Sequence, residues 1–594
     1  MLERALAVAV ESAREAGAHL LADFHRPGGA RGAGDKADAD TEAERGIRAR
    51  LMAAFPRFGY RGEETGVQAG EPGQPIWLVD PNDGTRDYLA GRRGSAVSIG
   101  LVQEGRPVLG VVFAFAYPDD AGDLFAWAEG TGPLRRNGRP VPTQLTTRLE
   151  ASDVVLVSSK GDLDPEGNLR HATPARYRSL ASIAHRLAVV AAGEAAAATS
   201  LFAPCAWDYG AGDALVRASG GCVLDESGRP VAYDRTGDSR ARRAMGGSAE
   251  VAALLSRRPW DVHSGAWGAE RPARLRRGEA VADPARLARA QGSLLGQIAG
   301  DNLGALVEFQ SADEVARAYP EGPRRLVDGG RWNLLAGQAT DDSEMALALA
   351  RSIEGEGGYD PRRALEAYQA WWASRPFDCG HTIHAALQGQ PNEGSQANGS
   401  LMRASPLGVL AHRRSPQEAA EMARRDSALT HPHPVCGDSV AAFVVAVSHA
   451  IDQGDGAAAA YGAALQWARD APAASSVIKA LEAAAHAAPR CDGSSQGWVL
   501  IALQNAFYEL LHAGTVEDGL ARTILRGGDT DTNAAIAGAL LGAVHGREGL
   551  PAQWRSMILS CHPVHGVAAH ARPMAYWPVD VMELAERLLL AGER

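Results

Sequence analysis

The sequence has no excess of the positive charge that a nucleic-acid site would need. Of its 594 residues only Lys36, Lys160 and Lys479 are lysines, and the formal net charge is −11. Binding to nucleic acid without regard to sequence requires clustered positive charge, so this balance predicts no such partner. We attribute the scarcity of lysine to composition bias, with anion recognition by single arginines as the alternative. The acidic balance fits a soluble enzyme whose carboxylates hold cations.

Cysteine is also scarce, and no two cysteines form a C-x-x-C pair, which excludes zinc and redox motifs of that kind. Scattered cysteines in so long a chain are typical of reduced core residues in a cytoplasmic protein. No uninterrupted apolar run approaches the roughly 18 residues that would predict a membrane span. The charged amino terminus predicts an amphipathic helix rather than a signal peptide. The six cysteines are Cys205, Cys222, Cys379, Cys436, Cys491 and Cys561.

The composition changes over residues 256–285. This segment is rich in Arg, Pro and Gly and has no clean apolar period, so we interpret it as a linker. A chain of this length also exceeds what one hydrophobic core usually holds. We therefore predict a first domain over residues 1–255 and a second over residues 286–594.

The two predicted domains differ in hydrophobic period. Upstream of the linker, helical stretches alternate with strand-like runs, and Asn137-Gly138 predicts a hairpin turn, so the first domain is expected to be α+β. Downstream, alanine-rich amphipathic segments follow one another without strand alternation, which predicts an all-α domain. The helices expected upstream are 2–24, 38–55, 179–193 and 208–220. Those expected downstream include 284–300, 343–354, 437–452, 496–512 and 532–545.

Three separated pieces of the first domain carry oxygen-bearing residues suited to a hard cation. An apolar strand runs into Asp80, and Pro81 then forces a turn that lets Asp80 and Asp83 point at one place. Free N–H groups of a helical turn beginning near Gly84 would face an anion. A lone D-x-x-D is most often a helix cap or a turn, so the conjunction of the pieces favours a metal and phosphate site. The pieces are Gly62-Glu63-Glu64, Asp80-Pro81-Asn82-Asp83-Gly84-Thr85 and Trp207-Asp208.

These strings, with Asp40-x-x-x-Glu44, resemble the inositol-monophosphatase superfamily over about residues 1–250. The resemblance implies an α+β layered sandwich and a Mg²⁺-dependent phosphomonoesterase. It pairs Asp40 with Thr85 to orient and deprotonate a water, and it makes Glu63 both catalytic and a metal ligand. The implied metal ligands are Glu63, Asp80, the Asn82 carbonyl, Asp83 and Asp208. The implied phosphate contacts are Gly84, Thr85 and Arg86.

Two positions depart from that family's pattern. The acidic residue that usually stands seven positions before the last metal aspartate, when inositol is the substrate, is Leu201 here. An aspartate that is common shortly after the V-A-x-G string is Ala196. Neither change removes a metal ligand. The first disfavours myo-inositol phosphate, so a nucleotide phosphate, as in the related bisphosphate nucleotidases, is an equal or better candidate.

In the second domain, aspartates stand at the starts of predicted helices. Asp341 and Asp342 precede an apolar helix, and Asp529 and Asp531 precede Ala534–Val544, which consists of small apolar residues. Carboxylates at the start of so apolar a helix need a cation or a ligand to compensate their charge. Each string taken alone also fits an ordinary cap or polar turn, and His431 alone fits a loop histidine.

Together these strings resemble the ADP-ribosylglycohydrolase family over about residues 288–580. The resemblance implies an all-α bundle that binds two Mg²⁺ or Mn²⁺ ions beside the scissile C1″ bond of ribose. It places Glu308 at the catalytic centre. The implied metal ligands are Thr340, Asp341, Asp342, Asp529, Asp531 and Thr532. The implied ADP-ribose groove contains Asn398, Gly399, Ser400 and His431.

The two resemblances predict a cytoplasmic bifunctional hydrolase with no membrane partner. One half would hydrolyse a phosphate monoester, and the other would cleave the ribosyl C1″ bond of a small-molecule or ADP-ribosylated substrate. The fusion suggests that both halves act on one phosphorylated ADP-ribosyl compound. The alternative is a nucleotide 3′-phosphatase fused to a module that binds ADP-ribose without cutting it. A homo-oligomer formed through the first half is expected by family analogy alone.

Overall fold

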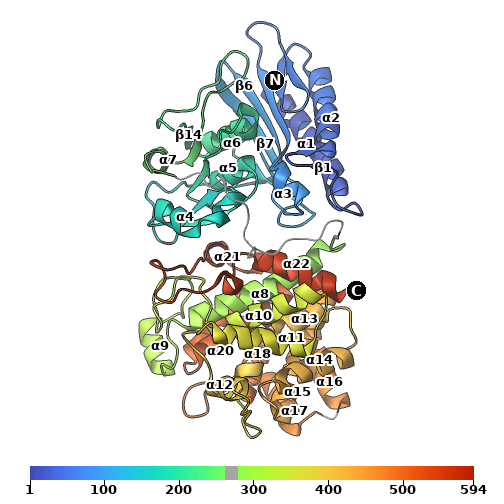
Figure 1. Ribbon diagram of the computed structural model, residues 1–594, viewed down its shortest axis with the longest axis vertical. Helices are drawn as coiled ribbons and strands as arrows, with labels where there is room; N and C mark the ends of the chain where they lie inside the picture. Colours follow the sequence, from blue (N-terminus) through green and yellow to red (C-terminus); the bar gives the residue numbers. More distant parts are fainter. Residues whose placement is uncertain (261–278, 472, 594) are drawn as a thin grey trace. The chain divides into compact units, whose positions relative to one another are not determined.

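The computed structural model describes residues 1–260, 279–471 and 473–593 (Figure 1). Of these, 1–260 and 279–280 belong to an N-terminal unit, and 281–593 belong to a C-terminal unit. The N-terminal unit ends with helix α7 (Ala249–Ser256), and helix α8 (Pro284–Gly304) begins the C-terminal unit. Residues 261–278 of the predicted linker lie outside the described residues, so the boundaries at 255 and 286 stay predictions.

The described part of the N-terminal unit contains an eight-stranded and a five-stranded sheet, besides the short ladder of β1 and β2. Their strand orders are β10-β9-β8-β7-β6-β5-β3-β4 and β12-β11-β13-β15-β14. Most neighbours are antiparallel, but β3 runs parallel to β5, and β11 runs parallel to β12 and β13. The strands are β1 (Gly32–Ala33), β2 (Lys36–Ala37), β3 (Gly59–Gly62), β4 (Gly66–Gln68), β5 (Ile76–Asp83), β6 (Ala96–Gln103), β7 (Arg106–Ala114), β8 (Asp123–Ala128), β9 (Arg135–Arg136), β10 (Arg139–Pro140), β11 (Val154–Val157), β12 (Arg176–Ser179), β13 (Ala197–Ser200), β14 (Cys222–Leu224) and β15 (Ala244–Gly247).

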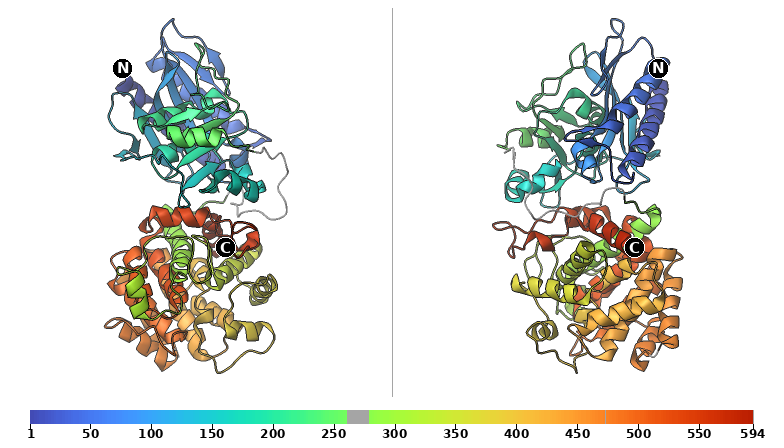
Figure 2. Two further views of the ribbon diagram at one scale, coloured as in Figure 1. Left: turned by 90° about the vertical axis from the view of Figure 1, so that its left-hand side faces the viewer. Right: turned by 45° about the vertical axis from the view of Figure 1, so that its right-hand side comes forward.

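Helices cover both faces of the large sheet, which is why β6 and β7 are buried along nearly their whole length. Helices α1 and α2 pack on one face, and α5 and α6 lie between the two sheets (Figures 1 and 2). This layered α+β arrangement confirms the predicted fold class. Asn137 and Gly138 have the positive φ angles of the predicted hairpin turn. The helices are α1 (Leu2–Phe24), α2 (Asp38–Ala54), α3 (Thr85–Leu89), η1 (Ser159–Leu163), α4 (Pro165–Ala172), α5 (Ile183–Ala191), α6 (Ala206–Ala218) and α7.

Glycines let helix α6 approach the large sheet at backbone distance. Gly100 and Gly110 pair across β6 and β7, directly beneath Ala211 of α6. A Cβ atom on Gly100 would lie 2.9 Å from the Ala211 nitrogen, and one on Gly110 would overlap the Ala211 carbonyl oxygen. This contact fixes the second turn of α6 against the sheet, next to the first turn, which carries Asp208.

The C-terminal unit is a helical bundle built around α8 and α20 (Thr530–His545). These two helices are buried along most of their length and pack against one another in the centre of the bundle (Figure 1). Its described residues contain isolated bridges but no strands, so the predicted all-α class is confirmed. The other helices are α9 (Ala312–Ala318), α10 (Asp341–Glu356), α11 (Pro361–Ala373), α12 (His381–Leu387), η2 (Asn398–Ser400), α13 (Ser405–Leu410), α14 (Pro416–Ala428), α15 (Pro434–Gln453), α16 (Ala457–Asp470), α17 (Ser475–Ala484), α18 (Val499–His512), α19 (Val516–Leu525), η3 (Arg547–Gly549), α21 (Ala552–Leu559), η4 (Met574–Tyr576) and α22 (Val581–Gly592).

A stripe of glycines at every fourth position makes the α8–α20 contact possible. A Cβ atom on any of these glycines would overlap backbone atoms of the facing helix. Positions four apart lie on one face of a helix, so the stripe forms a flat track along α8. Close contact of two backbones brings the carboxyl end of α8 beside the first turn of α20. The stripe consists of Gly292, Gly296, Gly300 and Gly304, facing Gly538 and Gly542.

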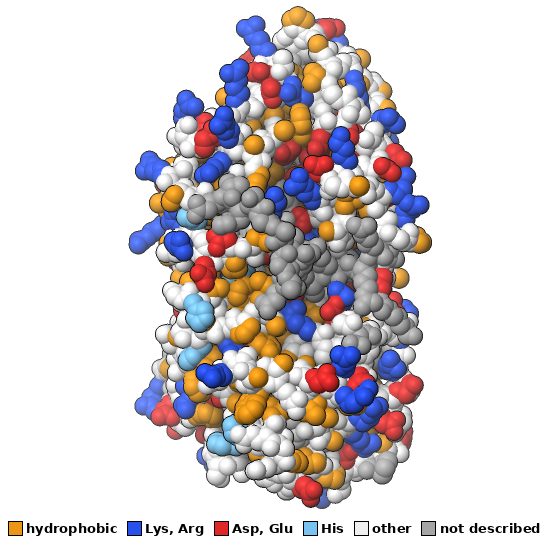
Figure 3. Space-filling view, viewed as in Figure 1, with side chains coloured by type: hydrophobic (Ala, Val, Ile, Leu, Met, Phe, Trp, Pro, Cys, Tyr) orange, Lys and Arg blue, Asp and Glu red, His pale blue; other side chains and the backbone are white. Residues whose placement is uncertain are grey.

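Three further features bear on the sequence-based expectations. Helix α15 is long and apolar enough to span a membrane by composition, but 89% of its apolar window is buried inside the C-terminal unit. None of the six cysteines forms a disulfide. Cys205 is exposed and Cys222 and Cys379 are half-buried, so the expected core position is wrong for these three. On the face in Figure 3, basic and acidic side chains both occur over each unit.

The glycine stripe makes a prediction about stability. Gly296→Ala should lower the free energy of unfolding of the C-terminal unit by about 1–3 kcal/mol, because the added methyl group overlaps the Gly538 carbonyl oxygen. Gly462→Ala, an exposed mid-helix position with open space around it, makes the same chemical change and should stabilise by about 0.5–1 kcal/mol. Urea unfolding of the full chain measures both, and equal effects would contradict the packing argument.

Candidate functional sites

In the N-terminal unit, two parallel strands deliver carboxylates to the same sheet edge. β3 and β5 pair through Gly62 and Val79, so Glu63 and Asp80 leave the ladder side by side, and the Glu63 N–H donates to the Val79 carbonyl. The β5–β6 register shifts between Asp80 and Asp83, where Pro81 has no N–H to offer. The Asn82 N–H instead donates to Asp80 Oδ1 at 2.8 Å. The predicted turn is therefore an irregularity within β5, and Asp80 and Asp83, on either side of it, still pair with Ser98 and Ala96 of β6.

Asp208 reaches the same place from the first turn of α6. Its Oδ2 accepts a hydrogen bond from the Cys205 N–H at 2.8 Å. Burial raises its pKa well above the usual range, and the charges of Asp83 and Glu63 raise it further. Burial raises the pKa of Asp80 well above its usual range, and the charges of Glu63, Asp83 and Asp208 raise it further. Burial also raises the pKa of Glu63 to about 7. Of these four carboxylates Asp80 is buried, Asp83 and Asp208 are half-buried, and Glu63 reaches the surface. A divalent cation would stabilise such a group of mutually repelling carboxylates.

A hydrogen-bonded trio stands beside these carboxylates. Asn82 Nδ2 donates to Asp40 Oδ1 at 2.9 Å, and the Thr85 hydroxyl lies 3.0 Å from both Asp40 Oδ2 and the Asn82 carbonyl oxygen. Asp40 comes from the first turn of α2 and is 1% exposed, and burial raises its pKa to about 7. Asn82 Oδ1 is buried and has no hydrogen-bond donor among the described residues. The trio joins a titratable carboxylate to a hydroxyl at the edge of the cluster.

A turn with the backbone geometry predicted for a phosphate contact is present at Gly84. Its φ of 104° is in the left-handed region, and helix α3 begins at the next residue, Thr85. A Cβ atom at Gly84 would approach Ser95 and Ala181 at 3.3 Å, so the turn is closely packed. Arg86 is exposed, and its guanidinium lies 3.3 Å from Asp35 Oδ2. The predicted residues Gly84 and Thr85 therefore lie at the cluster, whereas Arg86 pairs with a carboxylate at the surface.

Sequence reasoning assigned no role to Ser182, which holds one of the cluster's carboxylates in place. Asp83 Oδ2 accepts from the Ser182 hydroxyl at 2.6 Å and from the Ala184 N–H at 2.8 Å, at the start of α5. Glu44, quoted only as part of a motif, is fully buried and accepts from the backbone N–H groups of Glu64 and Thr65. It orients the loop that carries Glu63. A serine at a helix start gave no signal beyond that of an ordinary cap.

In the C-terminal unit, Asp301 of α8 fixes the start of α10. Its carboxylate accepts from the Thr340 N–H and hydroxyl and from the Ser343 N–H, at 2.9–3.2 Å. The Thr340 hydroxyl also lies 2.9 Å from Asp342 Oδ2. Asp341 and Asp342 consequently occupy the first turn of α10, both buried, with pKa values that burial raises well above the usual range. Asp342 Oδ1 meets no hydrogen-bond donor among the described residues, which fits a ligand atom for a cation.

The first turn of α20 supplies the facing carboxylates. Asp531 lies beside Gly304 at the end of α8, and burial raises its pKa, as do Glu308 and Asp342. Asp529 precedes the helix and accepts from Asn398 Nδ2 at 2.7 Å. Together with Asp341 and Thr532, these two aspartates line a cavity of about 260 Å³. The glycine stripe and the Asp301 bonds thus bring two helix starts to one cavity.

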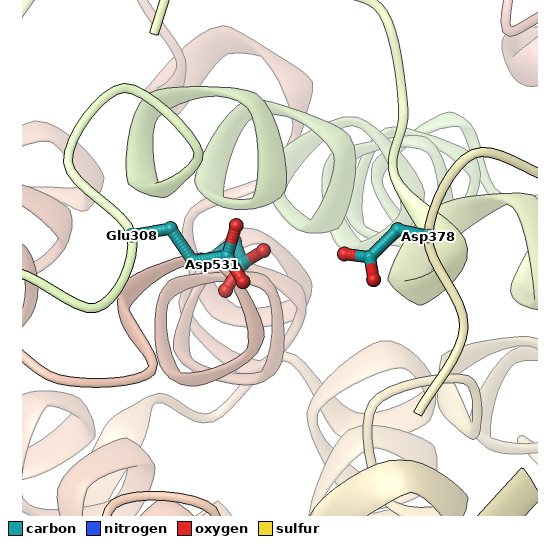
Figure 4. Close-up of side chains that lie close together, drawn as sticks. All are labelled: Glu308, Asp378 and Asp531. Carbon is teal, nitrogen blue, oxygen red and sulfur yellow. The ribbon is translucent and has the colours of Figure 1, made fainter. Parts of the chain in front are cut away.

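A cluster of three carboxylates on this cavity includes Asp378, a residue that the sequence did not reveal. Glu308, Asp378 and Asp531 each place one carboxylate oxygen within 4.8 Å of the others (Figure 4). Asp378 comes from the loop between α11 and α12, where no recognisable motif marks it. Burial, and then the charge of Asp378, raises the pKa of Glu308 to about 8. The Trp332 indole N–H donates to Glu308 Oε2 at 2.7 Å and holds it in place.

The predicted ADP-ribose residues divide into lining and supporting positions. Asn398, Gly399 and His431 line the cavity. A Cβ atom on Gly399 would lie 3.1 Å from His431 Cε1, so glycine leaves room at this wall. Burial lowers the pKa of His431 to about 3, and its Nε2 has no partner among the described residues. Ser400 is fully buried and accepts from the Ser427 hydroxyl, so it lies behind the lining rather than in it.

Clustered carboxylates at strand and helix ends define a metal-dependent hydrolase in each unit. The inositol monophosphatase family matches residues 1–258, and the ADP-ribosylglycohydrolase family matches residues 282–593. The chain belongs to both families, as a fusion of one member of each. Both families are metal-dependent, and Mg²⁺ is typical of the inositol monophosphatases.

Characterised relatives match one unit or the other. The ADP-ribosyl-[dinitrogen reductase] glycohydrolase of Rhodospirillum rubrum is 32% identical over 285 residues, 46% of this chain and 90% of that protein. An ADP-ribosylarginine hydrolase of Pseudomonas putida is 28% identical over 288 residues, 45% of this chain and 73% of that protein. The inositol-1-monophosphatase of Mesorhizobium japonicum is 35% identical over 238 residues, 38% of this chain and 86% of that protein. Both units are therefore enzyme domains of hydrolase families.

The two carboxylate clusters predict two independent effects of metal. Mg²⁺ or Mn²⁺ should raise the melting temperature of each unit by several degrees over a NaCl control of equal ionic strength, because a ligand at a hundredfold its Kd stabilises by about 2.7 kcal/mol. Asp83→Asn should remove the shift in the N-terminal unit alone, and Asp531→Asn that in the C-terminal unit alone. Differential scanning calorimetry of the full chain resolves both. Shifts that survive in the double variant would contradict both sites.

Proposed function

We propose that the chain is a bifunctional hydrolase that removes phosphate from a monoester with its N-terminal unit and cleaves a ribosyl C1″ bond with its C-terminal unit. The observation that carries this is the burial of several carboxylates together in each unit. One cluster adjoins a phosphate-type turn, and the other adjoins a cavity of about 260 Å³. Burial without a cation would be costly, so the clusters support metal-dependent chemistry in both units.

In the N-terminal unit, Asp40 and Thr85 form the proton-transfer pair. The Thr85 hydroxyl donates to Asp40 and can accept from a water, so a proton passes from the attacking water toward Asp40. Glu63 lies at the same edge and serves both as a ligand and as a second acceptor. When bound, Mg²⁺ offsets phosphate charge and makes water more acidic. Its ligands would be Glu63, Asp80, the Asn82 carbonyl, Asp83 and Asp208.

The phosphate monoester would sit at the start of α3. Helix α3 begins at Thr85, and the N–H groups at a helix start have no acceptor within the helix, so they can stabilise an anion. Arg86 can join them only by leaving Asp35. Position 201 offers a leucine instead of a carboxylate to sugar hydroxyls, and Phe202 beside it is 37% exposed. This composition supports a nucleotide-like phosphate rather than inositol phosphate.

In the C-terminal unit, Glu308 and Asp378 would move the protons. Their carboxylates lie close enough to one another to serve one reacting carbon, with one giving a proton to the leaving group and the other taking one from water. When bound, two Mg²⁺ or Mn²⁺ ions hold the ribose hydroxyls and the water in place. Their ligands would be Thr340, Asp341, Asp342, Asp529, Asp531 and Thr532. Asn398, Gly399 and His431 would contact ADP-ribose, with Ser400 supporting that wall.

The fusion motivates a joint substrate, a phosphorylated ADP-ribosyl compound that one unit dephosphorylates and the other cleaves. Each unit carries its own complete set of carboxylates, so neither needs the other for its chemistry. A cytoplasmic location and self-association through the N-terminal unit are parts of the same proposal. They rest on the absence of disulfides among the six cysteines and on family analogy, respectively.

Single substitutions should separate the two activities. Asp40→Asn should lower phosphate release from p-nitrophenyl phosphate by about 10²- to 10⁴-fold, because the proton acceptor is lost, and leave release of ADP-ribose unchanged. Asp378→Asn should lower the release of ADP-ribose by a similar factor and leave phosphate release unchanged. Asp38→Asn, an exposed aspartate in the same turn of α2 as Asp40, is the matched control. Phosphate and ADP-ribose are measured on the full chain, and a variant that lowers both activities would argue against two independent sites.

The joint substrate is tested by comparing phosphorylated and plain ADP-ribosyl compounds. A shared substrate predicts that the phosphatase prefers an ADP-ribosyl phosphate over inositol 1-phosphate, 3′-phosphoadenosine 5′-phosphate and NADP in kcat/KM. It also predicts that Asp40→Asn causes a phosphorylated compound to accumulate. If the phosphatase ignores every ADP-ribosyl phosphate, the two units have separate substrates.

A further inference from the structure

A short hairpin at the rim of the C-terminal cavity carries a guanidinium to Glu308. Gly329 and Leu334 exchange backbone hydrogen bonds at 2.8 Å, and the Asn333 N–H donates to the Gly330 carbonyl, which closes a tight turn. The Arg331 N–H donates to the Ala305 carbonyl at 3.2 Å, so the turn is tied to the loop that follows α8. The two residues at the tip of the turn, Arg331 and Trp332, therefore have fixed backbones.

Both tip residues point at the same carboxylate. The Trp332 indole donates to Glu308 Oε2, and Arg331 Nε lies 3.9 Å from that oxygen. The Arg331 guanidinium lies 4.9 Å from the centre of the Phe309 ring and 5.5 Å from that of Trp332. Phe309 and Glu308 line the cavity, and the Arg331 side chain is 48% exposed. The Arg331 guanidinium thus already contacts both aromatic rings and lies close to the Glu308 carboxylate beside the cavity.

This arrangement limits what charge a substrate can bring to Glu308. A carboxylate flanked by aromatic rings attracts cations, and a leaving group with a guanidinium would seek the same contacts. Here those contacts are already made by Arg331. A second guanidinium would meet like charge at close range, whereas an anionic group would meet a planar donor suited to oxyanions. Asn398, Gly399 and His431 form another part of the cavity lining, which leaves the Arg331 rim for the leaving group.

We propose that the C-terminal site selects ADP-ribosyl compounds whose leaving group is an oxygen-linked anion, phosphate in the first instance, and disfavours guanidinium leaving groups. The proposal rests on the glycohydrolase function above and specifies its substrate class. In the reaction, the C1″–O bond breaks and its electron pair stays on the phosphate oxygen. Water supplies the new hydroxyl at C1″, and its remaining proton ends on the released phosphate. Arg331 stabilises the charge that develops on that oxygen.

The test compares two substrates in the full chain. The probes are ADP-ribose 1″-phosphate and ADP-ribosyl-arginine, assayed with Mg²⁺ and with Mn²⁺ in an Asp83→Asn background that silences the phosphatase unit. Water labelled with ¹⁸O identifies the bond that breaks, because cleavage of C1″–O leaves the released phosphate unlabelled and cleavage of P–O labels it. Arg331→Gln is compared with Arg325→Gln, an exposed arginine of the same segment.

The chain should favour the phosphate-linked probe and release unlabelled phosphate. Arg331→Gln should lower the ratio of kcat/KM for the phosphate-linked over the arginine-linked probe by about 10- to 100-fold, the effect of one charge-assisted hydrogen bond. Arg325→Gln should leave the ratio unchanged. Cleavage of both probes with a ratio insensitive to Arg331→Gln, or a preference for the arginine-linked probe, overturns this inference and leaves the glycohydrolase function standing. Release from neither probe overturns both.

Discussion

Buried negative charge is the constraint on which both units depend. Two unit charges 4 Å apart repel by about 4 kcal/mol at the effective dielectric constant near a protein surface, and each unit gathers at least four such groups. Protein donors relieve only part of this. Ser182 and Ala184 bind one oxygen of Asp83, and Asn398 binds one of Asp529. The repulsion that remains is what a bound cation would offset, so loss of metal should affect stability as well as catalysis.

Close packing of small residues places that charge. In each unit, a helix that begins with metal-type aspartates lies at backbone distance from its neighbour. In the N-terminal unit, α6 lies against Gly100 and Gly110, and in the C-terminal unit α20 lies against the glycine stripe of α8. A longer side chain at either contact would push the helix outward and carry its aspartates out of reach. The two folds are unrelated, but both position an aspartate in the same way. Glycines on the neighbouring element let the helix that carries the aspartate pack closely near its start.

Much of the fold and of the sites could be predicted from the sequence, because local patterns carry them. Helical and strand periods distinguished the two classes, and the motif aspartates lie at their clusters. Boundaries were less accurate. The helix expected from residue 179 is strand up to Ser179 and helix from Ile183, because β12 pairs with β11 there. The helix expected from residue 343 begins at Asp341, since Asp301 caps it from another helix. Residues held by distant partners leave no local signal: Asp378 and Ser182 were missed for this reason, and Ser400 faces Ser427 instead of the cavity.

The proposed anionic substrates bear on why arginine, rather than lysine, stands beside the C-terminal cavity. If its substrates are anionic, as proposed, an acidic chain must create positive potential at each site. In the N-terminal unit the start of α3 and the cations proposed to bind there would supply it. In the C-terminal unit Arg331 would join the proposed cations, whereas burial lowers the pKa of His431 to about 3. Under the proposed function, a fixed positive charge is needed most where the leaving group departs, because the bound ions would lie on the ribose side. An arginine fixed by a hairpin and two aromatic rings meets that need more rigidly than a lysine would, because its planar fork is oriented before the substrate arrives.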